Sequence, residues 1–406
     1  MSAAPGVESA GGPLQGLKVV DAASIFAGPV AATLLADFGA DVLKVEHPRG
    51  DSLRSMGWNV EGESLFWALV SRNKRCVTLK LSAPEGAEIL KKIVADADVF
   101  VENFRPGTLE RWGLGPDVLH EINPGLVILR TTGFGQTGPY ANRPGFGTLA
   151  EAMSGFAHIN GWPDKPPALP PFALGDCIAG FTGCFAIMFA LWWREHGGNG
   201  KGQVIDLSIY EPMFWMLGPQ TILYDKTGEV VGRSGNHTPY SAPRNAYQTK
   251  DGRWLALSAT AQSIADRVVK LVGRPDLAEQ PWFTGNPGRI AHTEELDDAI
   301  GGWIGERTAE EVLAEFETAE GAIAPAYTAA DIVEDPQYLA RETIVRVPHE
   351  GLGDVLMQNV VPVLSDTPGR VRHAGAPKGS SNHEVYRDQL GMTDEQLAAL
   401  EADGVI

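Results

Sequence analysis

The sequence predicts an α/β fold, in which helices cover both faces of a parallel β-sheet. Short apolar runs at residues 17–20, 42–45, 76–81, 99–101 and 126–129 alternate with helical stretches through the first third of the chain. Short continuous apolar runs are typical of strands buried on both faces, and their alternation with helices is typical of a parallel sheet. A later uncharged stretch at residues 177–193 predicts a long apolar helix.

The helices between these strands begin and end at recognisable residues. Pro29 lies near the start of the first helix and Gly39 just past its end, which is the usual placement of proline and glycine. The segment SAPE at residues 82–85 predicts a capping box that opens the next helix, whose apolar residues between 89 and 94 share one face. A further short helix is expected at residues 117–122.

The uncharged stretch at residues 177–193 has two interpretations. Its 17 residues reach the lower limit of a membrane span, which is roughly 17–25 residues. Gly180, Gly183 and the polar Thr182 suit close packing inside a protein. A buried core helix is therefore the favoured interpretation, and no membrane partner is expected.

The second half of the chain indicates a smaller α+β domain. A strand at residues 204–209 precedes a stretch at 225–243 that is rich in Gly, Pro and polar side chains, as linkers are. A strand at 254–258 and helices at 265–272, 294–306 and 310–317 follow, and a strand at 355–363 and a helix at 393–402 close the chain. We therefore expect a large α/β domain in residues 1–225, a small domain with linkers in 226–340 and a C-terminal part in 341–406.

Charge and composition exclude several classes of protein. The 406 residues carry 33 Lys and Arg against 51 Asp and Glu, a net charge of −18, so no nucleic-acid partner is expected. Cys76, Cys177 and Cys184 form no CxxC or Cys/His cluster, so no metal site is expected. Residues 1–15 lack the basic and apolar segments of a secretory signal. With an odd number of cysteines, this favours a reducing, cytoplasmic location.

The predicted sheet also marks where a ligand binds. Ligands of open α/β sheets bind outside the carboxyl ends of the strands, which points to residues 24–28, 46–49, 102–105 and 131–135. The GFGQTG segment at residues 133–138 matches GxGxxG, but a dinucleotide site must open a helix and here Pro139 follows. The GGNGKG segment at 197–202 lacks the residue order of a phosphate-binding loop and precedes a strand. Neither segment therefore predicts a nucleotide cofactor.

Asp176 is the most informative single residue, because it stands directly before the uncharged helix and after Leu174 and Gly175. An aspartate there can be an ordinary N-cap that accepts the free N–H groups of the helix and stays ionised. It can also be a catalytic carboxylate, since an apolar helix would bury it and Gly175 permits close approach of a ligand. The residues alone leave both interpretations open and favour the cap.

Motifs along the chain resemble those of the class III CoA-transferases, the CaiB/BaiF superfamily that includes formyl-CoA transferase. The resemblance covers about residues 14–406 and includes GADV with KVE at 39–46, NKR at 73–75, VENFRPG at 101–107, Gly175-Asp176 and TPGR at 367–370. It implies a doubly wound large domain built from both chain ends, with a smaller domain inserted between them. It also implies an interlocked homodimer, in which two chains thread through each other.

The resemblance implies a reaction as well. Asp176 aligns with the family's catalytic aspartate, which attacks an acyl-CoA thioester and passes CoA to a free carboxylic acid through anhydride and aspartyl-CoA thioester intermediates. Coenzyme A is then a cosubstrate, and no other cofactor is implied. The CoA contacts carried over by position are Phe26, Ala27, His47, Leu79, Ser82, Asn103, Phe104, Arg105, Arg111, Pro144 and Gly147. The basic residues among them, with Arg49 and Arg75, would hold the CoA phosphates on an otherwise acidic protein.

The sequence departs from the family's pattern at several positions. Phe26 stands where oxalate-using members have glutamine, and HTPYSAP at residues 237–243 replaces their glycine-only loop, which argues against oxalate. Gly147 stands where many members carry an acidic residue that can assist the nucleophile. Two other functions stay open. One is an α-methylacyl-CoA racemase, whose proton-moving histidine is Phe146 here, and the other is a non-catalytic acyl-CoA binder, which Gly147 motivates.

Overall fold

The structure, a computed structural model, describes residues 11–406. Most of the segment for which the sequence predicts no secretory signal, residues 1–15, lies outside them. The chain divides into a larger unit, which runs to Phe156 and continues in Leu169–Pro219 and Gln337–Ile406, and a smaller unit of Ala157–Ala168 and Gln220–Pro336. The expected boundaries after residues 225 and 340 lie a few residues from these. The assignment of Ala157–Ala168 to the smaller unit had no signal in the sequence.

The larger unit alternates strands and helices from its first residues onward. In chain order its elements are β1 (Lys18–Asp21), α1 (Ala27–Asp37), β2 (Asp41–Glu46), η1 (Ser52–Arg54), β3 (Asn59–Val60), β4 (Glu63–Ser64), α2 (Leu65–Val70), β5 (Lys74–Thr78), α3 (Pro84–Val94), β6 (Val99–Glu102), α4 (Thr108–Arg111), α5 (Pro116–Ile122), β7 (Val127–Thr132), α6 (Gly147–Met153), α8 (Leu174–His196), β8 (Val204–Ser208), α9 (Tyr210–Met216), β12 (Ile344–His349), β13 (Gly353–Gln358), η3 (His383–Gln389) and α18 (Asp394–Ala402). Helices α7 (Phe156–Ile159) and α17 (Pro336–Ala340) lie at the boundaries between the two units.

Six of these strands form one parallel sheet, as the sequence predicts. Their order is β5-β2-β1-β6-β7-β8, and every neighbouring pair is parallel. The chain therefore builds outward from β1 in one direction and then, from β6 onward, in the other. The point where the direction reverses lies between β1 and β6, and ligands of doubly wound sheets bind at this point.

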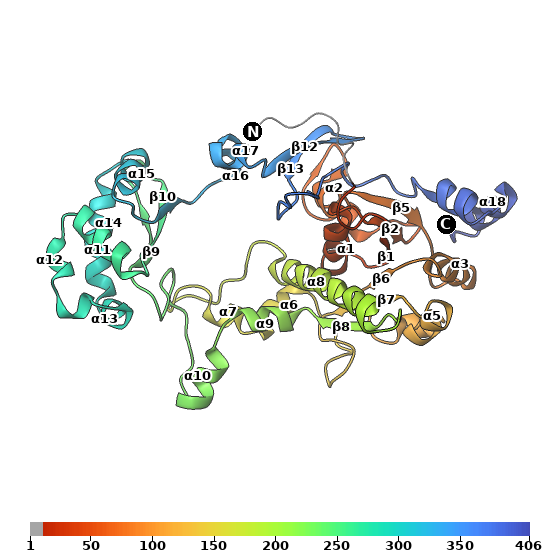
Figure 1. Cartoon of the computed structure of the whole chain (residues 1–406), viewed down its shortest axis with the longest axis horizontal. Helices are drawn as coiled ribbons and strands as arrows, with labels where there is room; N and C mark the ends of the chain where they lie inside the picture. Colours follow the sequence, from red (N-terminus) through yellow and green to blue (C-terminus); the bar gives the residue numbers. More distant parts are fainter. Residues whose placement is uncertain (1–10) are drawn as a thin grey trace. The chain divides into compact units, whose positions relative to one another are not determined.

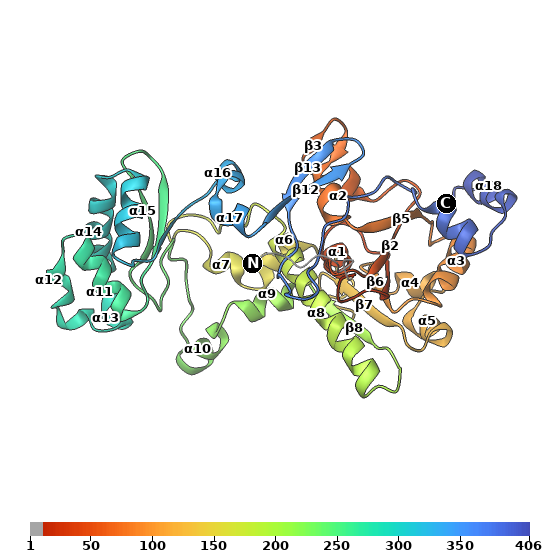
Figure 2. The same cartoon turned by 45° about the horizontal axis from the view of Figure 1, so that its top comes forward.

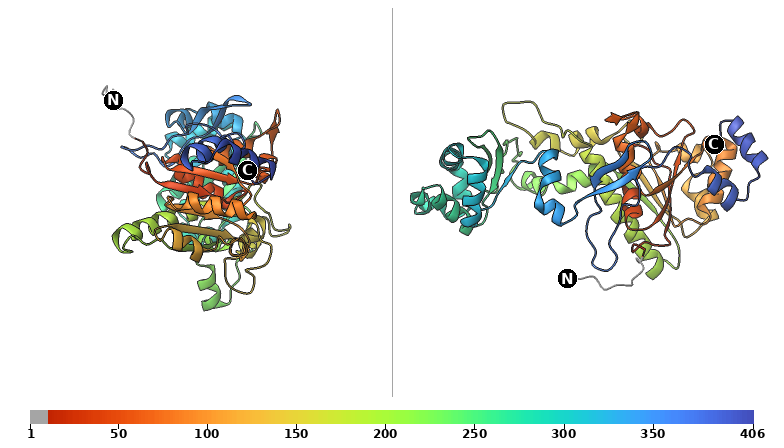
Figure 3. Two further views of the ribbon diagram at one scale, coloured as in Figure 1. Left: turned by 90° about the vertical axis from the view of Figure 1, so that its right-hand side faces the viewer. Right: turned by 90° about the horizontal axis from the view of Figure 1, so that it is seen from above.

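Alternate residues of each strand face two separate apolar cores. Val19 of β1 and Val99 of β6 face α1 and α8, whereas Val20 and Phe100 face α3 and α5. The second core also contains Tyr386, Leu397 and Ile406 from the end of the chain. Figure 1 shows α18 next to α3, and Figure 3 shows its dark blue ribbon beside the orange helices that include α3. The larger unit is thus built from both chain ends.

Helix α8 packs against α1 through its small residues. A Cβ atom at Gly180 would lie 2.6 Å from Val30 Cγ1 of α1, and one at Gly183 would lie 2.9 Å from Leu129 Cδ2 of β7, so the two glycines let α8 approach both α1 and the sheet. The opposite side of α8 exposes large apolar residues, namely Phe181, Phe185, Phe189, Trp192 and Trp193. The prediction of a buried helix therefore holds for one face only. Among residues 11–406, α8 is the one helix whose length and composition would allow it to cross a membrane.

Two local expectations are wrong in their details. Helix α3 begins at Pro84 after Ala83, and no side chain caps it, so residues 82–85 form no capping box. Proline at the first helical position favours a helix start there instead, because the N–H group that proline lacks would have no partner within the helix. The predicted strand at residues 355–363 ends at Gln358, since β13 pairs only with β12 in a two-stranded hairpin.

The smaller unit is an α+β domain (Figure 2). Its elements are α10 (Gln220–Thr227), β9 (Arg244–Gln248), β10 (Trp254–Ser258), α11 (Gln262–Leu271), α12 (Pro275–Ala278), η2 (Pro281–Phe283), α13 (Asn286–Ala291), α14 (Thr293–Gly305), α15 (Ala309–Thr318), β11 (Ile323–Pro325) and α16 (Ala329–Glu334). The antiparallel sheet β11-β10-β9 packs its apolar residues against α11, α14 and α15. Helix α10 occupies the start of the predicted linker at residues 225–243.

A buried ionic network holds the loops at the carboxyl ends of β1 and β2. Lys74 Nζ lies 2.9 Å from Asp21 Oδ2 and donates to the Pro29 carbonyl at 2.7 Å. Lys44 Nζ lies 3.2 Å from Asp51 Oδ2 and 3.8 Å from Asp21 Oδ1. Asp21 also accepts the Ala23 N–H at 3.1 Å, which fixes the chain just after β1.

Candidate active site

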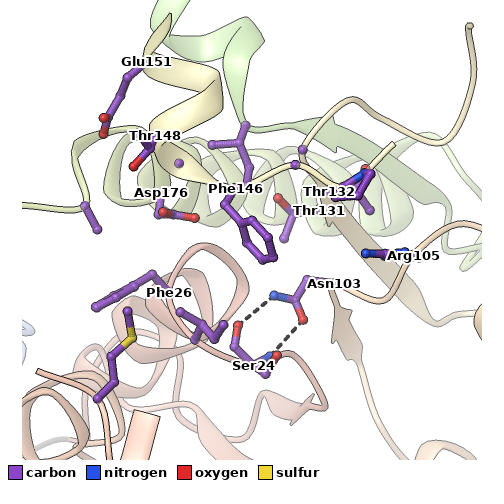
Figure 4. Close-up of a pocket in the computed structure, with 18 of the residues that line it drawn as sticks. Ser24, Phe26, Asn103, Arg105, Thr131, Thr132, Phe146, Thr148, Glu151 and Asp176 are labelled. Carbon is purple, nitrogen blue, oxygen red and sulfur yellow. Dashed lines mark hydrogen bonds between the residues drawn. The ribbon is translucent and has the colours of Figure 1, made fainter. Parts of the chain in front are cut away.

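A cavity of about 670 Å³ lies at the carboxyl edge of the sheet in the larger unit. The loops after β1, β6 and β7 line it, together with α6 and the start of α8 (Figure 4). Asp176, Phe146 and Asn103 face this cavity from three different segments of the chain. Three of the four strand ends that the sequence marks therefore meet here, and residues 46–49 do not line it.

Hydrogen bonds tie together the two loops on either side of the point where the strand order reverses. The Ser24 N–H donates to Asn103 Oδ1 at 2.8 Å, and Asn103 Nδ2 donates to the Ser24 carbonyl at 2.7 Å (Figure 4). Glu102, the last residue of β6, accepts the Phe104 N–H at 2.6 Å and the Arg130 Nε–H at 2.6 Å. These two bonds fix the start of the loop after β6. These bonds present Asn103 and Arg105 at the cavity wall.

Asp176 lies in the first turn of α8, not at its N-cap. The capping position is Ala173, which makes no side-chain bond, so the expectation of a helix-capping aspartate is wrong. A Cβ atom at Gly147 would lie 2.1 Å from Asp176 Oδ2, and one at Gly175 would lie 3.1 Å from the Gly147 carbonyl oxygen. The two glycines thus let the starts of α6 and α8 touch, with the Asp176 carboxylate against the Gly147 backbone.

Burial controls the charge of Asp176. It raises the pKa of the Asp176 carboxyl from its ordinary value of 3.8 to about 6, and the charge of Glu151 acts in the same direction. A hydrogen bond from the Gly147 backbone opposes this rise in the pKa. The helix start and its hydrogen bonds, expected to keep this carboxylate ionised, therefore do not lower its pKa, because desolvation outweighs them. The carboxylate is still mostly ionised at neutral pH.

Glu151 is a candidate functional residue that sequence reasoning missed. It lies on α6 one turn after Gly147, is 2% exposed, and its Oε1 accepts the Gly175 N–H at 3.2 Å. The larger unit therefore does hold an acidic side chain beside Asp176, although position 147 lacks one. The available signal was an acidic residue within GTLAEAM, a segment of otherwise small and apolar residues, four positions after that glycine.

The predicted CoA contacts fall into two groups. Those that line the cavity with Asp176 are Phe26, Asn103, Arg105, Pro144 and Gly147. Those outside the cavity lining are Ala27, His47, Leu79, Ser82, Phe104 and Arg111. Three residues of the second group still lie along the same edge of the sheet. His47 comes directly after β2, Leu79 comes directly after β5, and Phe104 lies near the end of β6.

The structure changes which charges are available to an anionic ligand. Burial, Arg49 and Lys80 lower the pKa of His47, so this imidazole contributes little positive charge at neutral pH. Arg75 forms ion pairs with Asp41 at 2.7 Å and Glu384 at 2.9 Å, so its charge already has partners, and its role in phosphate binding stays a prediction. Arg105 and Arg143 line the cavity and are the cations among its lining residues.

The glycine-rich segment at residues 133–138 forms a loop, as expected. Asp206 accepts the Gln136 N–H at 2.9 Å, and the next helix, α6, begins only at Gly147. A Cβ atom at Gly133 would lie 2.5 Å from the Gly145 Cα, so this loop folds tightly back on itself. It opens no helix in the manner of a dinucleotide site.

Comparison with known proteins identifies the family. Residues 14–382 match CoA-transferase family III. The chain belongs to this family. Among curated relatives, the succinyl-CoA–D-citramalate CoA-transferase of Chloroflexus aurantiacus is 42% identical over 97% of this chain and 98% of its own length. The beta subunit of the succinyl-CoA–L-malate CoA-transferase of the same organism is 43% identical, with the same coverage.

Solved structures agree with this assignment. A CaiB/BaiF family protein from Brucella suis superimposes with a TM-score of 0.82 at 32% identity, covering 93% of this chain and 100% of that one. A hypothetical protein from Mycobacterium tuberculosis gives a TM-score of 0.80 at 27% identity, covering 93% and 99%. The chain is therefore a family III CoA-transferase, and the cavity at the sheet edge is its candidate active site.

Proposed function

We propose that this enzyme transfers CoA from an acyl-CoA thioester to a free carboxylic acid, with Asp176 as the covalent nucleophile. The observation that carries the proposal is a buried carboxylate, mostly ionised at neutral pH, on the wall of the cavity where a doubly wound sheet binds its ligand. A carboxylate can attack a thioester without prior loss of a proton, so no separate base is required.

The proposed CoA transfer takes four steps. The Asp176 carboxylate attacks the thioester carbonyl, the C–S bond breaks, and CoA thiolate leaves behind an aspartyl–acyl anhydride. The thiolate then attacks the aspartyl carbonyl, which releases the first acid and forms an aspartyl-CoA thioester. The acceptor carboxylate attacks that thioester to give a second anhydride and thiolate. Attack of the thiolate on the acceptor's acyl carbon yields the new thioester and restores the Asp176 carboxylate.

Each tetrahedral intermediate carries an oxyanion that needs N–H donors. In the first turn of α8 the Leu174 N–H donates to the Phe172 carbonyl at 2.8 Å and the Gly175 N–H to Glu151 at 3.2 Å, so we assign the oxyanion to the backbone N–H of Asp176 itself. The Gly147 backbone, which touches the Asp176 carboxylate, supports the same role.

The relatives' names and the cavity charges together support a dicarboxylic substrate. Both curated relatives described above are named for succinyl-CoA with citramalate or malate. A dicarboxylic acid keeps one free carboxylate when the other is bound to CoA. Arg105 and Arg143 at the cavity wall supply cations that can pair with this free carboxylate. We therefore favour succinyl-CoA as donor and a four- or five-carbon hydroxy dicarboxylic acid as acceptor. Phe26 at the wall argues against oxalate, as the sequence indicates.

The proposal is tested by incubating the enzyme with succinyl-CoA and malate or citramalate. The expected products are succinate and the CoA ester of the acceptor, identified by mass spectrometry. Racemase activity would instead scramble the stereocentre of an α-methylacyl-CoA, and Phe146, which cannot move a proton, argues against it. A non-catalytic binder would retain CoA esters unchanged, and either outcome would contradict the transferase reaction.

Arg111 is expected to grip the phosphate end of CoA. Its side chain is exposed and donates only to Thr108 Oγ1, at 2.9 Å, among the hydrogen bonds of the described residues. Arg111→Ala should raise the KM for acyl-CoA about tenfold and change kcat by less than about twofold, because a phosphate contact remote from the reacting carbon binds ground state and transition state alike. The exposed Arg341→Ala serves as the matched control, and an unchanged KM in Arg111→Ala would remove this contact from the proposal.

The homodimer belongs to the proposal as well. Phe181, Phe185, Phe189 and Trp192 form a continuous exposed face of α8, at 51–67% exposure, and monomeric soluble proteins rarely leave so large an apolar surface open. We propose that a second copy of the chain covers this face in an interlocked dimer. Ultracentrifugation at nanomolar concentration should then show one species of twice 43.5 kDa, since threaded chains separate only on unfolding. A stable monomer under these conditions would exclude the interlocked arrangement.

A further inference from the structure

We infer that Glu151 is a positioning residue for Asp176. Glu151 holds the peptide that carries this nucleophile, and its charge disfavours the free Asp176 carboxylate relative to the acylated form of Asp176. The inference rests on the proposed role of Asp176 as nucleophile. It assigns a function to a residue on α6 that forms no bond to the substrate.

The contacts of Glu151 point toward Asp176. Its Oε1 accepts the N–H of Gly175, at 3.2 Å, and this residue directly precedes Asp176. Glu151 is 2% exposed and lines the same cavity, and Figure 4 shows its carboxylate on the same side of the cavity as Thr148 and Asp176. The hydrogen bond therefore fixes the start of α8 from the neighbouring helix.

The burial of the Glu151 charge is not explained by an ion pair. Glutamate is almost never fully buried unless a cation pairs with it. In the part of the chain that the structure describes, the side-chain hydrogen bond of Glu151 goes to a backbone amide, and the ion pairs of the larger unit involve other carboxylates. A buried carboxylate next to a second one destabilises the fold, and a neutral side chain could accept the same hydrogen bond, so its charge points to a role in the reaction.

Space explains why this carboxylate stands at position 151. Any side chain at position 147 would place its Cβ 2.1 Å from Asp176 Oδ2 and displace the nucleophile. Residues four apart on a helix lie on the same face. Position 151 is therefore the next position on α6 that faces Asp176, and it has room for a side chain.

The charge of Glu151 acts on the free Asp176 carboxylate and not on its covalent states. In the free enzyme two carboxylates lie close together, and burial with the charge of Glu151 raises the pKa of Asp176 to about 6. When Asp176 forms the anhydride or the CoA thioester, it loses its charge and the repulsion disappears. Glu151 itself gains or loses no proton and forms no bond in these steps.

Other titratable groups near Asp176 are few. Cys177 follows it on α8, Arg105 and Arg143 line the cavity from the loops before α4 and α6, and Tyr210 and Glu211 lie on α9, which packs against α6 and α8. Glu211 accepts the Ser208 hydroxyl at 2.6 Å. Among these groups and Glu151, only Glu151 contributes a charge effect to the raised pKa of Asp176.

Glu151→Gln tests the inference, because it removes the charge and keeps an oxygen that can accept the Gly175 N–H. Wild-type kcat/KM for succinyl-CoA should fall as the pH drops through about 6, where Asp176 of the free enzyme becomes protonated. In Glu151→Gln this acid limb should move to lower pH. At neutral pH kcat should fall about tenfold, which corresponds to about 1.4 kcal/mol, while the KM for succinyl-CoA changes by less than about twofold. Glu121→Gln, an exposed residue of α5, carries the same charge change outside the cavity and should leave the profile unchanged.

Glu151→Asp is the second variant in this test. It keeps the charge but shortens the side chain, so the acid limb should stay near its wild-type pH while kcat falls through loss of the Gly175 contact. An acid limb in Glu151→Gln that stays at the wild-type pH would overturn the inference. So would a Glu151→Asp profile that shifts as far as that of Glu151→Gln. Neither result bears on the proposed function, which fails separately if Asp176→Ala still transfers CoA.

Discussion

Asp176→Ala is expected to reduce CoA transfer on the order of 10³-fold or more, because it removes the carboxyl group that is part of every covalent intermediate. Asp176→Asn should be equally inactive, since an amide is a far poorer nucleophile than a carboxylate. Wild-type enzyme incubated with succinyl-CoA should carry an adduct on the peptide that contains Asp176. Hydroxylamine should release this adduct, and mass spectrometry detects it.

The fold should survive both substitutions at position 176. Asp176 does not cap α8, so its removal leaves no helix end unsatisfied. Burial raises its pKa, which means that the ionised group disfavours the folded state at neutral pH and that asparagine should keep or increase stability there. Asp117→Ala, which removes an acidic residue from the first turn of α5, is the matched control and should retain activity. Substantial transfer by Asp176→Ala would exclude the covalent mechanism.

Local sequence patterns were sufficient to predict the parallel sheet and the edge of it at which the cavity lies. Apolar runs mark strands, and the ends of those strands carry Ser24, Asn103 and Thr131, which all line the cavity. The strand order was not predictable from these patterns, because it depends on which strands pair. Residues 46–49 follow a strand in the same way, yet β2 lies away from the point of reversal, and they do not line the cavity.

The chemistry of the site was less predictable than its place. The sequence shows Asp176 before an apolar helix, which is the usual position of a cap, whereas the helix in fact begins two residues earlier, at Leu174. The raised pKa of Asp176 comes from burial and from Glu151, and both depend on contacts between α6 and α8. The exposed aromatic face of α8 was missed for a related reason, since an apolar sequence does not say which chain covers it.

Lys74→Met is expected to lower the free energy of unfolding by about 3–5 kcal/mol, the usual effect of removing one partner of a buried ion pair. Lys74 and Asp21 are both fully buried, and their Nζ–Oδ2 distance is 2.9 Å. The substitution leaves the Asp21 carboxylate with Lys44, whose Nζ lies 3.8 Å from the other oxygen, as its nearest cation. The Pro29 carbonyl also loses its donor from Lys74. Methionine fills a similar volume, so a loss of packing contributes little.

A matched substitution separates this effect from the loss of any lysine. Lys91→Met breaks a surface pair with Glu88 on α3 and should change the free energy of unfolding by less than about 1 kcal/mol. Adding Asp21→Leu to Lys74→Met should recover part of the loss, because no buried charge is then left unpaired. Urea unfolding at a fixed protein concentration measures all three variants. Equal losses for Lys74→Met and Lys91→Met would mean that the buried network does not stabilise the fold. If the network does stabilise it, the loop through Ala23 to Ser24 is anchored from the core, which keeps the cavity wall in place for Asp176.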